Sequence, residues 1–259
     1  MFDILNSNFF SAFFGAIAGA LAAAWLAWHT ETRRQLKDEI LACNVAINQC
    51  AAIANSFVAV KRQTVRPVCL RYALQSIALF FHGVNVGGGV LEIALDFNVL
   101  TSPWTSIDTL NGIISTRIWS AAQPSALAAS LSQAIHNQRN ATERRNEIGQ
   151  KIAACQPNEK TARYFGLRLP TGGLDTSYPD IMSGLYSYTD DCIYFPALLA
   201  AVLTAHGNAL AAKLGRSAPR IKTLDLSAVQ RDGLLPEPAQ YPEFESVYRP
   251  KDPELVVGM

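Results

Sequence analysis

Residues 9–28 read FFSAFFGAIAGALAAAWLAW, twenty positions without a charged side chain. As an α-helix this run is about 30 Å long, which matches the hydrocarbon core of a bilayer. A polar and basic stretch, residues 29–37, follows at once. We therefore predict a single transmembrane helix over residues 9–28, preceded by a short extracytoplasmic N-terminus of residues 1–8.

The basic residues next to the span predict its orientation. Asp3 is the only charged side chain before the span, whereas Arg33, Arg34 and Lys37 lie just after it. Lys and Arg near a span stay preferentially on the cytoplasmic side. We expect the body of the chain to be cytoplasmic, held at the inner (plasma) membrane.

Aromatic residues lie at both ends of the span, where amphipathic rings favour the headgroup layers. Phe9 and Phe10 mark the outer interface, and Trp25 and Trp28 mark the inner one. A cleaved signal peptide is an alternative, but it needs a basic n-region that residues 1–8 lack, and the run is long for its h-region. A buried soluble helix is a third interpretation, against which the absence of a polar face argues.

Small residues form a row along the span. Gly15 and Gly19 make a GxxxG pair, and Ser11 and Ala23 extend it by one step each way. In lipid, helices associate where small residues let their backbones approach closely. The row predicts a homo-oligomer formed through the transmembrane helix. The alternative is that an Ala-rich span contains such spacings by chance.

Composition restricts the classes of function. The 22 Lys and Arg nearly balance the 21 Asp and Glu, so no field favours nucleic acid as a general partner. Hydrophobic residues make up 49% and charged residues 17%, which indicates a folded body and argues against global disorder. Five cysteines, an odd number without a CxxC motif, indicate free thiols and neither a disulfide framework nor a zinc site. No cofactor is expected.

A heptad pattern follows the span without an intervening Gly or Pro. Apolar or small residues recur in alternating steps of four and three at Leu36, Ile40, Cys43, Ile47, Cys50, Ala54 and Phe57. The pattern predicts a helix from Leu36 to about Arg62, ended by Pro67, which continues the transmembrane helix. This helix is either one strand of a parallel coiled coil between chains or part of an intramolecular bundle, since both use the same period.

The rest of the chain is predicted to be mainly helical, with one β hairpin. Alternation of apolar and polar residues over 91–99, after the triple glycine 87–89, predicts a hairpin near residues 82–99. Helices are expected over 104–122, 124–155 and 179–214, the last kinked at Pro196 and ended by Gly215. Residues 219–226 are a further candidate strand.

The predicted fold class is therefore mostly α with a small β hairpin, in which a transmembrane helix continues into a helical-bundle cytoplasmic domain. That domain spans residues 29–232. Five prolines follow Gly233, so residues 233–259 are expected to form an extended or disordered tail.

One short motif points to chemistry. The string Tyr188-Thr189-Asp190-Asp191 resembles the YxDD box of reverse transcriptases, in which paired aspartates hold magnesium for nucleotidyl transfer. The resemblance implies Asp190 and Asp191 as weak candidate metal ligands. The flanks read as helix and no companion aspartate motif or basic groove accompanies them. Residues at the spacings of a zinc site, a phosphate loop or a nucleophile elbow are also missing.

Two functions remain open. The first is a single-pass, membrane-anchored interaction, scaffold or signal-relay protein without catalytic activity, whose partners are the bilayer, its own copies and an unknown soluble protein. The second is a membrane-anchored, metal-dependent enzyme that uses Asp190 and Asp191. We favour the first, because no set of residues meets the requirements of a catalytic site.

Overall fold

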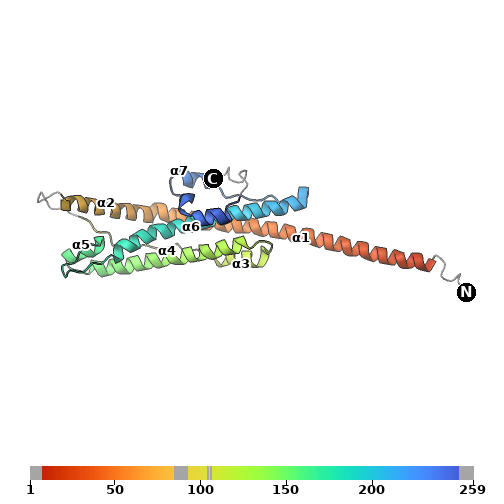
Figure 1. The fold of residues 1–259 in the computed structure, drawn as a ribbon, viewed down its shortest axis with the longest axis horizontal. Helices are drawn as coiled ribbons and strands as arrows, with labels where there is room; N and C mark the ends of the chain where they lie inside the picture. The colour runs from red at the N-terminus through yellow and green to blue at the C-terminus, as the bar shows by residue number, and fades with distance from the viewer. Residues whose placement is uncertain (1–7, 85–92, 104, 106, 251–259) are drawn as a thin grey trace.

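One long helical rod forms the backbone of the molecule (Figure 1). The computed structural model describes residues 8–84, 93–103, 105 and 107–250, and the side chains of these residues except 8–12 and 82–84. Helix α1 (Asn8–Val60), the π-helical turn η2 (Lys61–Val65) and helix α2 (Arg66–Val84) follow one another without a break. At about 1.5 Å per residue the rod is on the order of 115 Å long.

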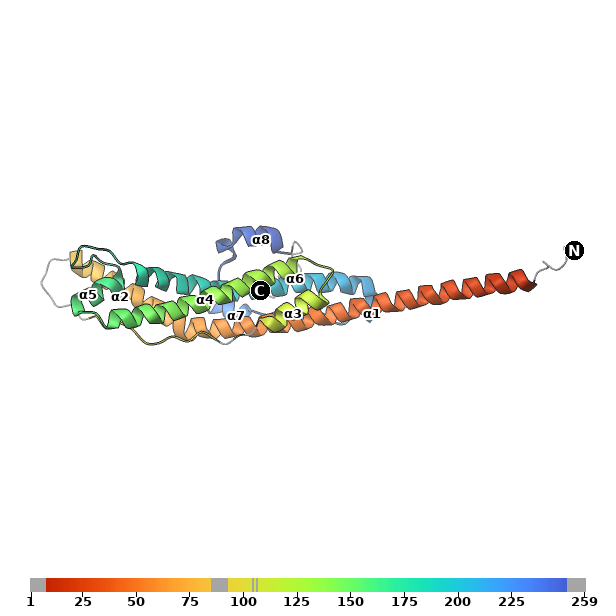
Figure 2. The same cartoon turned by 90° about the horizontal axis from the view of Figure 1, so that it is seen from below.

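The second half of α1 packs into a helical bundle, while the first half projects beyond it (Figures 1 and 2). Helix α6 (Ser177–Leu214) lies between α1 and α4 (Gln123–Ala153) and contacts both along its length. Helix α3 (Asp108–Arg117) covers α1, and α5 (Pro157–Phe165) covers the end of α4. Because α6 is enclosed by its neighbours, more than half of its residues are buried.

The heptad line of α1 lies inside this bundle. Ile40, Cys43, Ile47, Cys50 and Phe57 are all buried, and they pack against side chains of the same chain. The intramolecular bundle is therefore the correct one of the two interpretations of this seam. The bundle of long helices confirms the predicted helical class of the fold.

Pro67 does not end the helix, contrary to the sequence-based expectation. Proline lacks an N–H donor and its ring clashes with the carbonyl four residues earlier, so it breaks a regular α-helix. Here the five residues before Arg66 widen into a π-helix, in which the N–H of Arg66 donates to the carbonyl of Lys61. This wider turn accommodates Pro67 and lets α2 continue the rod.

The predicted hairpin near residues 82–99 is wrong for the part of it that is described. Helix α2 runs to Val84, and residues 93–100 form an extended segment without a strand partner; residues 85–92 lie outside the described residues. Side chains bond this backbone in place of a neighbouring strand. Gln75 donates to the carbonyl of Ala94 at 2.6 Å, and Asn146 bonds both the N–H and the carbonyl of Leu100.

Two of the three helices predicted after this segment are close to their expected bounds. These are α4 and α6, and Gly215 ends α6 with a positive φ of 64°. Helix α3 is shorter than the predicted 104–122. Residues 219–226 form no strand; Asn44 of α1 bonds the carbonyl of Arg220 at 2.9 Å and the N–H of Lys222 at 2.8 Å.

The C-terminal segment is folded as far as residue 250, so the expected extended or disordered tail does not hold for residues 233–250. It contains the 3-10 turn η4 (Pro238–Gln240) and the short helix α8 (Pro242–Tyr248), and it follows the 3-10 turn η3 (Gly215–Ser217) and the short helix α7 (Ser227–Arg231). Aromatic contacts compensate for the prolines. Tyr241 stacks on Tyr194 of α6 with ring centroids 3.7 Å apart, and Phe244 meets Phe195 edge to face.

Candidate functional site

The projecting half of α1 is an exposed apolar helix. Every residue from Phe13 to Trp28 is exposed, and its large side chains, such as Trp25 and Trp28, expose 41–67% of their surface. Among the described residues, two helices are long and apolar enough to cross a membrane, but the one at 177–217 is mostly buried core. A signal sequence near the N-terminus passes the same test of length and composition. The predicted markers Phe9 and Phe10 have no described side chains.

The small-residue row of the span is open to a partner. A Cβ atom added at Gly15 or Gly19 would meet nothing within 4 Å, and Ala23 is exposed. The side chain of Ser11 lies outside the described set. A second helix can therefore approach this face as closely as its backbone allows.

The basic cluster after the span has a role that the sequence did not indicate. Arg33 donates to Ser217 Oγ at 2.6 Å and to the carbonyl of Leu214 at 3.4 Å, so it caps the C-terminal end of α6. Arg34 lies on the exposed side, 4.0 Å from Asp38, and Lys37 is half-buried. Arg33 thus fixes the end of the bundle within two turns of the apolar run.

Asp190 does not lie in an exposed helical turn but forms a buried ion pair. Lys61 Nζ of η2 lies 2.5 Å from Asp190 Oδ1 and donates to the carbonyl of Leu234 at 3.0 Å, and both charged side chains are less than a tenth exposed. The ammonium also lies 5.0 Å from the ring centroid of Tyr186. Burial raises the pKa of the Asp190 carboxyl, while Lys61 opposes this shift.

Asp191, the second candidate ligand, bonds the C-terminal segment. Its Oδ1 accepts a hydrogen bond of 2.8 Å from Tyr241, and burial raises the pKa of its carboxyl. No cluster of three or more His, Cys, Asp and Glu side chains suited to a metal occurs in the part of the chain that the structure describes. The two aspartates thus connect α6 to η2 and to the C-terminal segment.

A Ser–His–Glu cluster joins α1, α6 and the loop after α3. The buried Glu39 Oε1 accepts from Ser120 Oγ at 2.6 Å and contacts His206 Nε2 at 3.0 Å, and Ser120 Oγ lies 3.2 Å from the same nitrogen. In a catalytic triad the serine and the acid bond opposite nitrogens of the histidine. Here both meet Nε2, so the cluster cannot relay a proton as a triad does and serves to join the helices.

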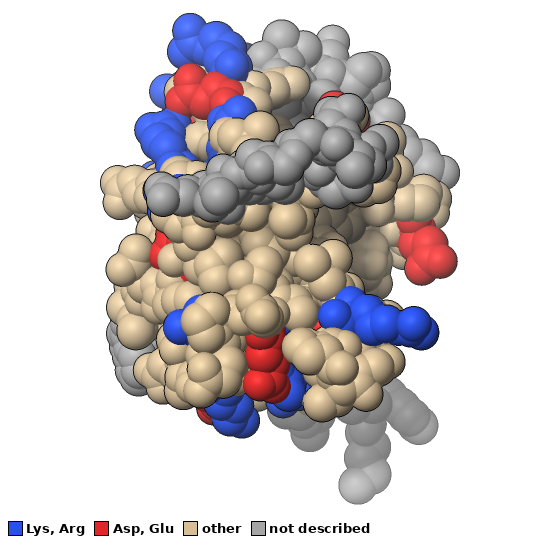
Figure 3. All heavy atoms as spheres, turned by 90° about the vertical axis from the view of Figure 1, so that its left-hand side faces the viewer, with Lys and Arg blue, Asp and Glu red and all other residues tan. Residues whose placement is uncertain are grey.

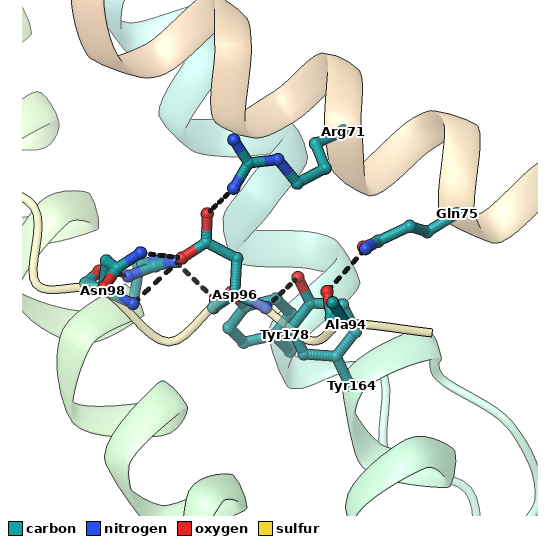
Figure 4. A network of polar contacts seen from close by, with 8 residues as sticks. Arg71, Gln75, Ala94, Asp96, Asn98, Tyr164 and Tyr178 are labelled. Carbon is teal, nitrogen blue, oxygen red and sulfur yellow. Dashed lines mark hydrogen bonds and ion pairs between the residues drawn. The ribbon is translucent and has the colours of Figure 1, made fainter. Parts of the chain in front are cut away.

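A polar network holds the extended segment 93–100 at the far end of the bundle (Figure 4). Arg71 of α2 reaches Asp96 Oδ2 at 2.6 Å, and Tyr164 and Tyr178 bond the backbone of Asp96. The fully buried Arg145 donates to the carbonyls of Asp96, at 2.8 Å, and of Asn98. The sequence does not single out Arg145, because the adjacent Arg144 is the same residue type and is exposed. No local pattern distinguishes the buried arginine from the exposed one.

Helix α2 presents an apolar face to solvent. We name this surface the α2 patch; its members Leu70, Leu74, Ile77, Phe80 and Phe81 are 52–68% exposed. An open groove of about 510 Å³ borders it, between α2 and residues 93–94. The far end of the rod carries charged side chains mainly at its edges (Figure 3). Among the described residues, the α2 patch and the projecting half of α1 are both large exposed apolar surfaces.

Comparisons of the chain with protein-family models, with curated proteins and with solved structures find no match.

Proposed function

We propose that this chain is a single-pass, membrane-anchored interaction protein without catalytic activity, whose helical body stands on the cytoplasmic side of the inner (plasma) membrane. The observation that carries the proposal is the exposure of every residue from Phe13 to Trp28 ahead of a well-packed bundle. Seven large apolar side chains of this run are about half exposed, and their transfer from water to lipid is worth on the order of 10 kcal/mol.

The rigid connection between the apolar run and the body supports a scaffold or relay role. Helix α1 passes from residues 13–28 into the bundle without a break, and Arg33 ties it to the end of α6. Such a helix holds the body at a fixed distance from the bilayer. Arg33, Arg34 and Lys37 favour a cytoplasmic body. Cys43, Cys50 and Cys192 are free and buried, which suits a reducing compartment.

We further propose that copies associate through the row containing Gly15, Gly19 and Ala23. The open space beside both glycines supports this contact. An unidentified soluble protein is the remaining proposed partner.

Membrane fractionation of the full-length chain tests the anchor. We expect the protein in the high-speed pellet, resistant to carbonate and released by detergent, with an intact mass that includes residues 9–28. A full-length protein that stays in the supernatant without detergent, or a product cleaved after the apolar run, would refute the anchor.

Cross-linking in membranes tests the association. We expect Gly15→Leu with Gly19→Leu to lower the yield of cross-linked oligomer, because leucine side chains separate the helix backbones. The matched control is Ala20→Leu with Ala24→Leu, which places two leucines at the same spacing about 140° round the helix. Equal yields from the two double variants would rule out the glycine face.

A further inference from the structure

We infer that the α2 patch docks against the same helix of a second copy, parallel to it, in the same membrane. The inference deepens and rests on the proposed function, because the anchor sets the parallel direction. Leu70, Leu74, Ile77 and Phe81 follow one another in steps of four, three and four, the spacing of a coiled-coil seam. All four are more than half exposed, so no other segment among the described residues covers this seam, although residues 93 and 94 border it.

The flanks of the seam suit a second copy. The positions beside it are Arg66, Arg71, Ala73, Ala78 and Phe80. In parallel helices, the residue before one seam position faces the residue five further along in the partner, which pairs Ala73 with Ala78 and Arg66 with Arg71. Arg71 lies 2.6 Å from Asp96, which offsets its charge, and Arg66 donates to the carbonyl of Asp232 at 3.4 Å. Two identical faces thus meet through uncharged residues at the centre of the seam, and Asp96 offsets the arginine pair at its edge.

The size of the α2 patch also fits contact between anchored copies. Its five side chains together expose on the order of 500 Å², close to the upper end for an isolated patch on a soluble monomer. Two patches would bury about 1,000 Å² in total, which is characteristic of a weak complex in solution. Confinement to one membrane raises the effective concentration and compensates for that small area.

The α2 contact is independent of the proposed glycine contact. Leu74 lies about 85 Å along the rod from the middle of the Gly15–Gly19 pair, at 1.5 Å per residue. Helices that cross at about 40° at a GxxxG pair are tens of ångströms apart at that distance. The α2 contact therefore joins a pair of copies that need not share the glycine contact.

Site-specific cross-linking of the full-length chain in membranes tests the inference. In a Cys69→Ser, Cys155→Ser background, Leu74→Cys places one thiol on the seam, and a short bis-maleimide joins it to the same residue of a second copy. The matched control is Gln150→Cys, exposed on α4. We expect about tenfold more cross-linked dimer from Leu74→Cys, equivalent to about 1.4 kcal/mol.

Two further variants sharpen the result. Ile77→Glu places like charges across the seam on an exposed residue and should abolish the Leu74→Cys dimer, whereas Gln150→Glu should leave it unchanged. Gly15→Leu with Gly19→Leu should also leave it unchanged.

The possible failures are distinguishable. A pelleted protein that gives no more dimer with Leu74→Cys than with Gln150→Cys refutes the α2 contact and leaves the anchor intact. An adduct with the mass of another protein, or loss of the dimer in the glycine variant, also refutes it. A full-length protein in the supernatant refutes the anchor, and the parallel contact with it.

Discussion

Asp190→Asn removes the negative charge that compensates the buried ammonium of Lys61. The partners left to Lys61 Nζ are the carbonyl of Leu234 at 3.0 Å and the face of Tyr186 at 5.0 Å. Both charged side chains of the pair are less than a tenth exposed, so water cannot replace the carboxylate. Breaking a buried ion pair from one side typically lowers the free energy of unfolding by about 3–5 kcal/mol.

Lys61→Met should cost less, and its cost should depend on pH. Burial already raises the pKa of Asp190 above its usual value of 3.8, and losing Lys61 raises it further. A carboxyl whose pKa is higher in the folded than in the unfolded protein stabilises the fold at pH values below its pKa in the unfolded protein. This stabilisation is lost as the pH rises through its pKa in the folded protein. We therefore expect Lys61→Met to be more destabilising at pH 8 than at pH 5. The double variant, Asp190→Asn with Lys61→Met, should lose about 2 kcal/mol or more less free energy of unfolding than the sum of the two single losses.

Urea denaturation of the full-length protein in mild detergent, followed by circular dichroism, measures these changes. The control is the neighbouring pair Arg62–Asp232, whose side chains are 54% and 53% exposed. Breaking that pair with Asp232→Asn should cost less than about 1 kcal/mol. If Asp190→Asn costs no more than this control, Lys61 and Asp190 are hydrated in the folded protein and the reasoning fails.

Three further predictions use the same denaturation assay. Arg145→Met should lower the free energy of unfolding by about 2–4 kcal/mol, because it removes the buried donor to the carbonyl of Asn98 and leaves the carbonyl of Asp96 with Tyr178 alone. A loss below about 1 kcal/mol would contradict this. Gly166→Ala should lower the free energy of unfolding, since Gly166 has a φ of 66° and an added Cβ would lie 2.9 Å from Pro179. Gly112→Ala, in open space within α3, should raise the free energy of unfolding by about 0.5–1 kcal/mol. Equal effects of the two substitutions would refute the strain argument. Hydrogen bonds from Ser177, together with Arg163, lower the pKa of Asp175 below 3.8 in the folded protein. Asp175 therefore stabilises the fold above pH 3.8, and this stabilisation is lost as the pH falls through its pKa in the folded protein. Asp175→Asn should therefore make stability less sensitive to acid below about pH 4, and an unchanged acid transition would show that the aspartate has no such role.

The candidate sites could be predicted only in part. The apolar run 9–28 and the glycine pair stand out because they are local patterns. Asp190 and Asp191 also stood out as a pair, but their partners Lys61 and Tyr241 are 129 and 50 residues away in the chain. Glu39 lies beside the apolar seam, where a charged side chain is ordinarily exposed, and the partners that bury it come from two other segments.

The sequence alone determined the helices whose signals repeat along the chain: the apolar run, the heptad seam of α1, and α4 and α6 with the C-cap Gly215. Periodicity predicts these because a helix satisfies its own backbone hydrogen bonds. Only the tertiary structure decided that the seam packs within one chain and that residues 93–100 bond side chains in place of a strand. It also decided that aromatic stacking folds the proline-rich segment as far as residue 250. These outcomes depend on contacts between distant residues, whose geometry no local pattern encodes.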